Sequence, residues 1–262
     1  MTTMSIETLK SIKASGNKFA AITAYDYSFA KLVDKADIEV TLVGDSLGNV
    51  IQGQRTTIPV TLDEMAYHTN NVRRGIQSSL ILSDMPFMSY GTVPQALENA
   101  AILMQAGAQM VKLEGGEWLS ETVYALTERG IPVCAHLGLT PQSVHKLGGF
   151  KVQGKDANAA DKIVSDAKIL ESAGADLLVV ECVPSTLGKE LASSLNIPVI
   201  GIGAGSDTDA QVLVLQDMLG ISDGAPKFSK NYMAQSSSIE EALRTYRNEV
   251  LSGAFPEPKH QF

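Results

Sequence analysis

Short apolar runs that each stop at a charged or titratable residue are the feature of this chain that most constrains its fold. Five runs end in this way, at Asp45, Asp84, Glu114, His136 and Glu181. Apolar runs without polar alternation are typical of parallel strands that are covered on both faces. Since the strands of a parallel barrel all point their carboxyl ends to one face, we expect these five groups to meet there.

Eight strand-like runs alternate with helical patterns along the chain. They cover residues 19–24, 40–44, 79–83, 109–113, 131–135, 176–180, 197–202 and 212–216. An open doubly wound sheet would require a glycine-rich turn after the first strand, and residues 23–28 contain no glycine. We therefore predict an α/β fold, a (β/α)8 TIM barrel that forms a single domain over residues 1–262.

Four helices are predicted from capping and periodicity signals, over residues 65–74, 92–105, 158–172 and 238–251. The first follows a capping box, in which the side chains of Thr61 and Glu64 satisfy backbone N–H groups at the helix start. The last lies in a C-terminal helical tail, which is expected to pack on the barrel or on a neighbouring subunit. Two segments without a helical pattern, 47–60 and 138–156, are expected to be lids or binding loops.

Composition excludes several classes of protein. The formal net charge of -8 argues against a nucleic-acid-binding protein, which usually carries a basic patch. No apolar stretch approaches the roughly 18 residues that suggest a membrane span, and residues 1–18 lack the apolar centre of a secretory signal. Cys134 and Cys182 lie in apolar runs and are expected to be buried thiols in a reducing compartment. We predict a cytoplasmic protein.

Asp45 and Asp84 follow neighbouring strands and are the first candidates for chemistry. Adjacent strands lie about 4.8 Å apart, so these two carboxylates can share one cation. Without a cation, their like charges would raise a pKa or destabilise the fold. Oxygen ligands that leave room for water and substrate suit Mg²⁺ better than Zn²⁺. With Glu114 nearby, a magnesium site is predicted; the alternative for each single aspartate is a helix or turn cap.

Lys112 and Glu114 lie two residues apart on one strand and therefore face the same side. Lysine is almost never buried unless it is paired. At the mouth of the barrel, Lys112 can meet an anionic substrate or an enolate oxygen. A simple ion pair between Lys112 and Glu114 is the alternative, and the two interpretations are compatible. A Schiff-base role is conceivable, but a metal that polarises the carbonyl makes it unnecessary.

Glu181 and His136 complete the predicted rim. A partly desolvated carboxylate such as Glu181 suits a general base that removes a proton next to a polarised carbonyl. The alternative is that Glu181 only pairs with Lys112 or His136. His136 is as consistent with a structural group as with a catalytic one. The glycines of residues 201–205 are predicted to shape the pocket wall rather than to bind phosphate.

The chain resembles the ketopantoate hydroxymethyltransferase family over nearly its whole length. The stretches that carry the resemblance are Thr-Ala-Tyr-Asp-Tyr (23–27), Val-Gly-Asp-Ser-Leu-Gly (43–48), Pro-Val-Thr-Leu-Asp-Glu-Met (59–65), Val-Lys-Leu-Glu-Gly-Gly (111–116), Ala-His-Leu-Gly-Leu-Thr-Pro-Gln (135–142), Gly-Gly-Phe-Lys-Val-Gln-Gly-Lys (148–155), Glu-Cys-Val-Pro (181–184) and Gly-Ile-Gly-Ala-Gly (201–205). The chain departs from the family pattern at Asn49, Ser206, Ala210 and Gln216, none of which is a proposed catalytic position.

The resemblance implies a reaction and a set of partners. It implies transfer of a hydroxymethyl group from 5,10-methylenetetrahydrofolate to 3-methyl-2-oxobutanoate, which forms 2-dehydropantoate in pantothenate biosynthesis. It also implies Mg²⁺ and a large homo-oligomer, commonly a decamer. No feature of the sequence by itself indicates where folate binds.

The resemblance further implies roles for individual residues. The metal ligands would be Asp45 and Asp84, with Glu114 acting through water. Ser46 would contact the 2-oxo acid, and Lys112 would be its cationic partner. The base would be Glu181, and His136 would lie in the same pocket.

Two other classes of function compete with this interpretation. One is a Mg²⁺-dependent carbon–carbon lyase or phosphonomutase on a similar barrel. Such relatives typically carry a cysteine on a mobile loop, and neither cysteine of this chain is expected in a loop. The other is a non-catalytic metabolite-binding barrel, which would tolerate the loss of the rim carboxylates.

Overall fold

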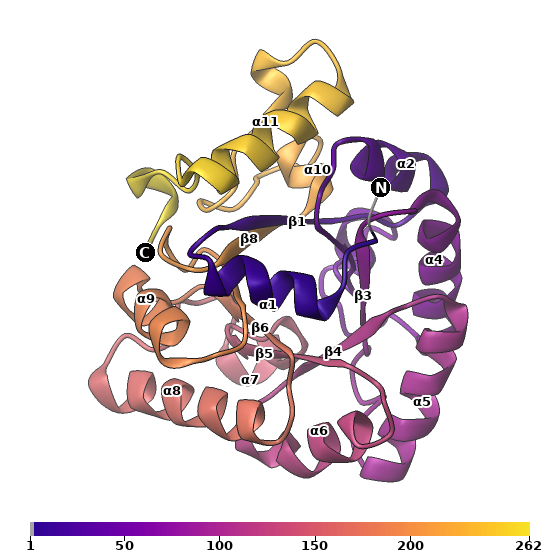
Figure 1. The fold of residues 1–262 in the computed structure, drawn as a ribbon, viewed down its shortest axis with the longest axis vertical. Helices are drawn as coiled ribbons and strands as arrows, with labels where there is room; N and C mark the ends of the chain where they lie inside the picture. The colour runs from indigo at the N-terminus through magenta and orange to yellow at the C-terminus, as the bar shows by residue number, and fades with distance from the viewer. Residues whose placement is uncertain (1–2) are drawn as a thin grey trace.

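A computed structural model describes residues 3–262, within which eight parallel strands close into a barrel in sequence order (Figure 1). The strands are β1 (Phe19–Thr23), β2 (Val40–Val43), β3 (Leu80–Asp84), β4 (Met110–Glu114), β5 (Val133–Gly138), β6 (Leu177–Glu181), β7 (Val199–Ile202) and β8 (Ala210–Leu213). The ring closes where β1 pairs with β8, with Ile22 opposite Leu213. The predicted (β/α)8 barrel is confirmed.

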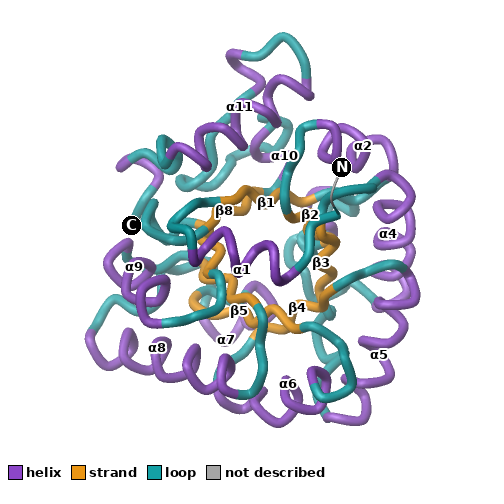
Figure 2. The backbone as a smooth tube through the Cα atoms, viewed as in Figure 1, coloured by secondary structure: helices purple, strands orange, loops and turns teal. Residues whose placement is uncertain are grey.

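Helices lie around the ring of strands on its outer side and across the end of the ring that faces the viewer (Figure 2). They are α1 (Ile6–Ala14), α2 (Tyr27–Lys35), α3 (Leu47–Val50), α4 (Leu62–Gly75), α5 (Val93–Ala106), α6 (Ser120–Thr127), α7 (Val144–Leu147), α8 (Ala157–Ser172), α9 (Ser185–Ser194), α10 (Leu215–Met218) and α11 (Ile239–Ser252). None of the helices within residues 3–262 has both the length and the apolar character needed to cross a membrane.

The capping box predicted at the start of α4 is present. Thr61 Oγ1 accepts a hydrogen bond from the Glu64 N–H at 3.3 Å, and Glu64 Oε2 accepts one from the Thr61 N–H at 2.8 Å. The helix α5 ends at Gly107, whose φ of 115° is accessible to glycine because it has no Cβ. The capping box starts α4 at Leu62, three residues before the predicted start at residue 65, whereas the end of α4 and both ends of α5 lie within one residue of the prediction.

The predicted strand bounds shift by up to three residues, most at the fifth strand, which is 133–138 rather than 131–135, and at the eighth, and two predicted loops contain helices. The eighth strand is 210–213 rather than 212–216, because Thr23 Oγ1 accepts a hydrogen bond from the Leu215 N–H and the chain then turns into α10. The predicted loop 47–60 begins with the one-turn helix α3, and the loop 138–156 contains α7. Periodicity does not detect helices of a single turn, because they are too short to repeat.

The helix α1 covers the amino-terminal end of the barrel and crosses in front of the strands in Figure 1. Lys10 Nζ lies 2.9 Å from Asp176 Oδ1, and Lys13 Nζ lies 2.8 Å from Asp209 Oδ2. These two aspartates directly precede β6 and β8, so α1 is tied to strand beginnings. The opposite end, where the strands finish, is left for the functional groups.

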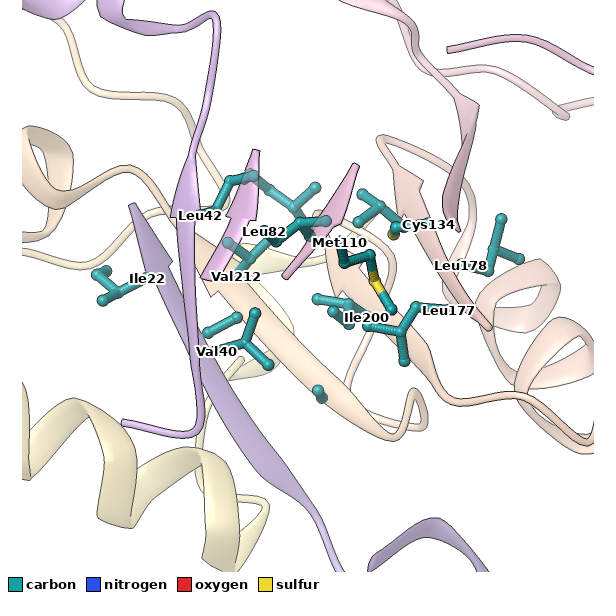
Figure 3. Packing of buried hydrophobic residues seen from close by; sticks show 14 of the residues in the cluster. Ile22, Val40, Leu42, Leu82, Met110, Cys134, Leu177, Leu178, Ile200 and Val212 are labelled. Atoms are coloured by element: carbon teal, nitrogen blue, oxygen red, sulfur yellow. The ribbon is translucent and has the colours of Figure 1, made fainter. Parts of the chain in front are cut away.

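The interior of the barrel is a continuous apolar core (Figure 3). Side chains from several strands gather there, among them Val40, Leu82, Met110, Leu177 and Ile200. Cys134 and Cys182 are both free thiols and buried, as predicted. The strands are buried along their length, which explains why their sequences do not alternate between polar and apolar residues.

The C-terminal helix α11 packs on the chain's own barrel. Tyr246 is fully buried, and its hydroxyl oxygen lies 2.9 Å from the carbonyl oxygens of both Ala21 and Gln211. These carbonyls belong to β1 and β8, so the tail holds the joint at which the ring closes. The structure thus favours packing on the barrel over the alternative of packing on a neighbouring subunit.

We expect Asp34→Asn to lower the free energy of unfolding by about 0.5–1.5 kcal/mol at neutral pH, after allowance for partial exposure. Asp34 Oδ1 accepts hydrogen bonds from the backbone of Gln77, Ser78 and Ser79 before β3, and these bonds hold the pKa of Asp34 below its usual value despite partial burial. Urea denaturation of both forms measures the difference.

The stability difference should also depend on pH. A carboxylate whose pKa is lowered in the native state contributes stability above its unfolded pKa of 3.8, and this contribution is lost as the pH falls through the lower native pKa. Wild type and Asp34→Asn should therefore converge in acid. The exposed Asp161→Asn is the control; a difference that stays constant with pH would contradict the explanation.

Candidate active site

A cavity of about 800 Å³ opens at the carboxyl ends of the strands. All the residues predicted for the site line it, namely Asp45, Ser46, Asp84, Lys112, Glu114, His136 and Glu181. They come from the ends of β2 to β6, five consecutive strands of the ring. Parallel strands that end on one face bring these residues together although they span 137 positions of sequence (181 − 45 + 1).

The ammonium group of Lys112 lies at the centre of the buried charges. Its Nζ is 2.9 Å from Asp84 Oδ1, 3.8 Å from Glu114 Oε1 and 3.1 Å from His136 Nδ1. Burial opposes the charge, but the nearby carboxylates of Asp84, Glu114 and Asp45 outweigh it and raise the pKa of Lys112. Lys112 is therefore held as a cation, which disfavours a Schiff-base role and suits the binding of an anion.

Asp45 and Asp84 form the most acidic part of the site. The backbone N–H of Asp45 donates a hydrogen bond to Asp84 Oδ2 at 3.0 Å, and both side chains are buried. Burial and the charges of Asp84 and Glu114 raise the pKa of Asp45 well above its usual value. Neither aspartate caps a helix, since the residue at the start of α3 is Ser46 and makes no side-chain cap. The capping alternative is therefore wrong here.

Glu114 is tied to the other side of this cluster. Its Oε2 accepts a hydrogen bond from the Gln142 N–H at 2.9 Å, and its Oε1 lies 3.3 Å from His136 Nδ1. Burial opposes ionisation, but His136, Lys112 and the Gln142 N–H outweigh it and lower the pKa of Glu114. Glu114 thus stays charged, and the predicted Lys112–Glu114 pair is present at longer range than the pair between Lys112 and Asp84.

His136 connects the acidic cluster to Glu181. Its Nδ1 faces Lys112 and Glu114, and its Nε2 lies 3.3 Å from Glu181 Oε2. The two carboxylates favour the protonated ring, whereas Lys112 favours a neutral ring that accepts its hydrogen bond at Nδ1. The predicted pairing of Glu181 with His136 is present, and it leaves Glu181 on the cavity wall with its side chain 13% exposed.

The remaining predicted wall residues shape the pocket. Ser46 Oγ lies 2.8 Å from the hydroxyl of Tyr25, so Ser46 is oriented toward a buried partner. Gly203 has a φ of 59°, and a Cβ at this position would approach Phe228 to 2.9 Å. This glycine therefore allows the close packing of the wall, as predicted for residues 201–205.

Gln142 is the residue that sequence reasoning missed. Its Nε2 donates to Asp45 Oδ2 and to the Met85 carbonyl, each at 2.9 Å, and its Oε1 accepts a hydrogen bond from Tyr90. Its backbone N–H holds Glu114, so this one buried residue, through its side chain and its backbone, positions carboxylates from two strands. Gln142 belongs to one of the stretches that resemble the family, residues 135–142, but no local pattern distinguishes it from an exposed loop glutamine.

The side chains of this acidic cluster are the candidate ligands for Mg²⁺. Among residues 3–262, no three His, Cys, Asp or Glu side chains are grouped so that they could hold a metal together. The predicted site has Asp45 and Asp84 as direct ligands and Glu114 acting through water, so it does not require such a group of three. Mg²⁺ often takes only one or two carboxylates and keeps several waters. Asp84 Oδ1 and Glu114 Oε1 lie 2.9 and 3.8 Å from the Lys112 ammonium, and together with Asp45 these buried carboxylates carry more negative charge than that ammonium offsets, so this acidic pocket fits such a cation.

Solved structures of low sequence identity show the same fold. A phosphonopyruvate hydrolase in complex with oxalate and Mg²⁺ aligns with a TM-score of 0.64 and 14% identity, over 98% of this chain and 93% of that chain. At this identity the likeness supports the barrel and nothing finer.

Sequence relatives are far closer. A 3-methyl-2-oxobutanoate hydroxymethyltransferase of Shewanella loihica is 60% identical, and one of Shewanella sp. strain ANA-3 is 61% identical; both matches cover 100% of each chain. The sequence model of ketopantoate hydroxymethyltransferase matches residues 3–258. Together with the barrel and its rim of functional groups, these matches show that the chain belongs to the ketopantoate hydroxymethyltransferase family and is a hydroxymethyltransferase.

Proposed function

We propose that this enzyme transfers a hydroxymethyl group from 5,10-methylenetetrahydrofolate to 3-methyl-2-oxobutanoate with the assistance of Mg²⁺. The observation that carries the proposal is the division of one cavity between a carboxylate base, Glu181, and a buried ammonium, Lys112. His136 separates them, at 3.3 Å from Glu181 and 3.1 Å from Lys112. Proton removal and charge stabilisation can thus act on different atoms of one small substrate.

The acidic side of the cavity would orient the oxo acid. Lys112 offers a fixed positive charge, and the Ser46 hydroxyl offers a hydrogen-bond donor on the same wall. Asp45 and Asp84 would hold Mg²⁺ directly, with Glu114 acting through water. When bound, Mg²⁺ supplies positive charge opposite the oxygens of the oxo acid.

Glu181 would act as the base. Its carboxylate takes the proton from C3 of the oxo acid, and the electron pair of that C–H bond becomes available at C3. Water adds to the one-carbon unit, both bonds from that carbon to the folate nitrogens break, and the nitrogens keep the two protons of the water, so that tetrahydrofolate leaves. C3 then bonds to the carbon of the resulting formaldehyde-level unit, whose oxygen takes the proton held by Glu181 and becomes the new hydroxyl group. His136 can donate from Nε2 toward Glu181 and so hold the carboxylate in place.

Preorganised charge supports this assignment. Lys112, Asp84 and Glu114 are each at most 5% exposed, so water screens their charges weakly. An ammonium fixed in such a site stabilises negative charge that develops on the substrate without having to reorganise.

We also propose that the enzyme is a homo-oligomer, with a decamer expected from the family. Large aromatic side chains are exposed on the outer helices, including Tyr67 at 65% and Tyr124 at 57%. Surfaces of this kind are common in subunit interfaces. Light scattering coupled to size-exclusion chromatography should give a mass near ten chains; a monomer would contradict this part of the proposal.

Glu181→Gln should abolish proton removal and leave substrate binding in place. We expect deuterium uptake at C3 of 3-methyl-2-oxobutanoate, followed by NMR, to slow by about 10²–10⁴-fold. The affinity for the oxo acid in the presence of Mg²⁺ should stay close to that of wild type. The exposed Glu190→Gln is the matched control. Undiminished exchange in Glu181→Gln would remove Glu181 as the base.

Asp84→Asn should weaken Mg²⁺ binding about 10-fold or more and weaken oxo-acid binding with it. Isothermal titration with Mg²⁺ and then with the oxo acid measures both affinities. Asp84 also pairs with Lys112, so thermal unfolding of the variant must first show a folded protein. The surface variant Asp207→Asn serves as a control. Unchanged affinities in folded Asp84→Asn would refute the shared-cation site.

A further inference from the structure

The proposed chemistry uses only half of the cavity. Its groups stand at the ends of β2 to β6, whereas the other half is lined from β7, β8 and β1. Ligand pockets for drug-sized molecules typically have about 300–1,000 Å³, and a small branched oxo acid fills only a fraction of the 800 Å³ present. The unfilled half lies along the segment after β8, which contains Gln216 and Asp217.

Gln216 is a buried residue on this half of the cavity, and one polar atom of its side chain has no hydrogen-bond partner. The side chain lines the cavity and the residue is 7% exposed, yet its Oε1 has no hydrogen-bond partner. The turn that carries it is held by the backbone, because the N–H of Ile221 donates to the Gln216 carbonyl and the N–H of Leu215 donates to Thr23. The fold therefore does not use the side-chain amide, and an unsatisfied buried acceptor is costly unless a ligand pairs with it.

Asp217 is a buried carboxylate on the same wall. It is 8% exposed, and among residues 3–262 no cation offsets its burial. Desolvation therefore raises the pKa of Asp217, with only a partial offset from the nearby Ser222 hydroxyl. A ligand that donates two N–H groups would satisfy this carboxylate, which can accept a pair of parallel hydrogen bonds.

Apolar side chains contribute to the walls around these two groups, together with the polar residues Ser222, Asp223 and Lys227. Phe228 is buried, and Ile221 and Phe262 line the cavity while remaining 61% and 37% exposed. Exposed apolar side chains beside buried acceptors suit a flat ring that is apolar on its faces and carries donors on one edge. The edge of a reduced pterin has this character, because its ring N–H and its amino group lie side by side.

We propose that Gln216 and Asp217 bind the pterin ring of the one-carbon donor. Asp217 would accept hydrogen bonds from the ring N–H and the amino group, and the Gln216 amide would pair with the adjoining polar edge. This assignment rests on the proposed function, since it names the subsite for the donor in that reaction.

The position of the subsite suits transfer between the two halves. Thr23 Oγ1 accepts a hydrogen bond from the N–H of Leu215, two residues before Asp217. Tyr25 lies two residues after Thr23. The Tyr25 hydroxyl in turn contacts Ser46 on the oxo-acid side. A donor ring at Asp217 would therefore lie next to the oxo acid, with Tyr25 and Ser46 between the two subsites.

Asp217→Asn and Gln216→Leu test the assignment, with the surface variant Asp207→Asn as the matched control. The probes are tetrahydrofolate and a tetrahydropterin without the glutamate tail, both titrated calorimetrically. We expect Asp217→Asn to weaken both probes about 10-fold or more, because a charge-assisted pair is lost. Gln216→Leu should weaken them less. Deuterium exchange at C3 of the oxo acid, measured without donor, should stay within about twofold of wild type.

The outcomes separate this inference from the proposed function. A wild-type enzyme that neither exchanges deuterium nor binds tetrahydrofolate would overturn the proposed function. A wild type that does both, with variants that bind the probes equally well, would overturn only the pterin subsite. Variants that lose deuterium exchange together with donor affinity would show a general structural role and would also overturn it.

Discussion

The pairing of β1 with β8 is the constraint on which the rest of the structure depends. Hydrogen-bonded pairs from Phe19 with Ala210 to Ile22 with Leu213 join the two strands, and the Tyr246 hydroxyl lies against carbonyls of both. Closure turns eight strand ends into one rim around one cavity. In an open sheet these two strands would lie at opposite edges, and the segment after β8 could not face the acidic cluster.

Closure also sets the electrostatic character of the site. Removing an ionised side chain from water costs several kcal/mol, which only close pairing can repay. Asp84 lies 2.9 Å from the Lys112 ammonium and provides this close pairing, and Glu114 and His136 lie somewhat farther from it. Burial, together with the excess negative charge of the cluster, raises the pKa of Asp45. Under the proposed function, such a site would hold a cation and place an anionic oxo acid beside it.

Much of the fold and of the acidic half of the site could be predicted from the sequence. Buried parallel strands leave a visible pattern of apolar runs, and groups such as Asp84 and Glu181 interrupt that pattern at the strand ends. The eighth strand was predicted too far along the chain, because apolar residues continue past Leu213 into α10. A short apolar run is consistent with either a strand or a helix. Gln142 was missed because its partners come from segments up to 97 positions away.

The sequence by itself determined the barrel, the order of its strands and the row of titratable groups at their ends. These follow from local periodicity and capping, which each segment carries whatever its neighbours do. The tertiary structure alone decided that His136 links Glu114 to Glu181, that Gln142 holds two carboxylates, and that Gln216 and Asp217 face the same cavity. Such contacts join distant segments, and they exist only once closure of the ring has brought those segments together.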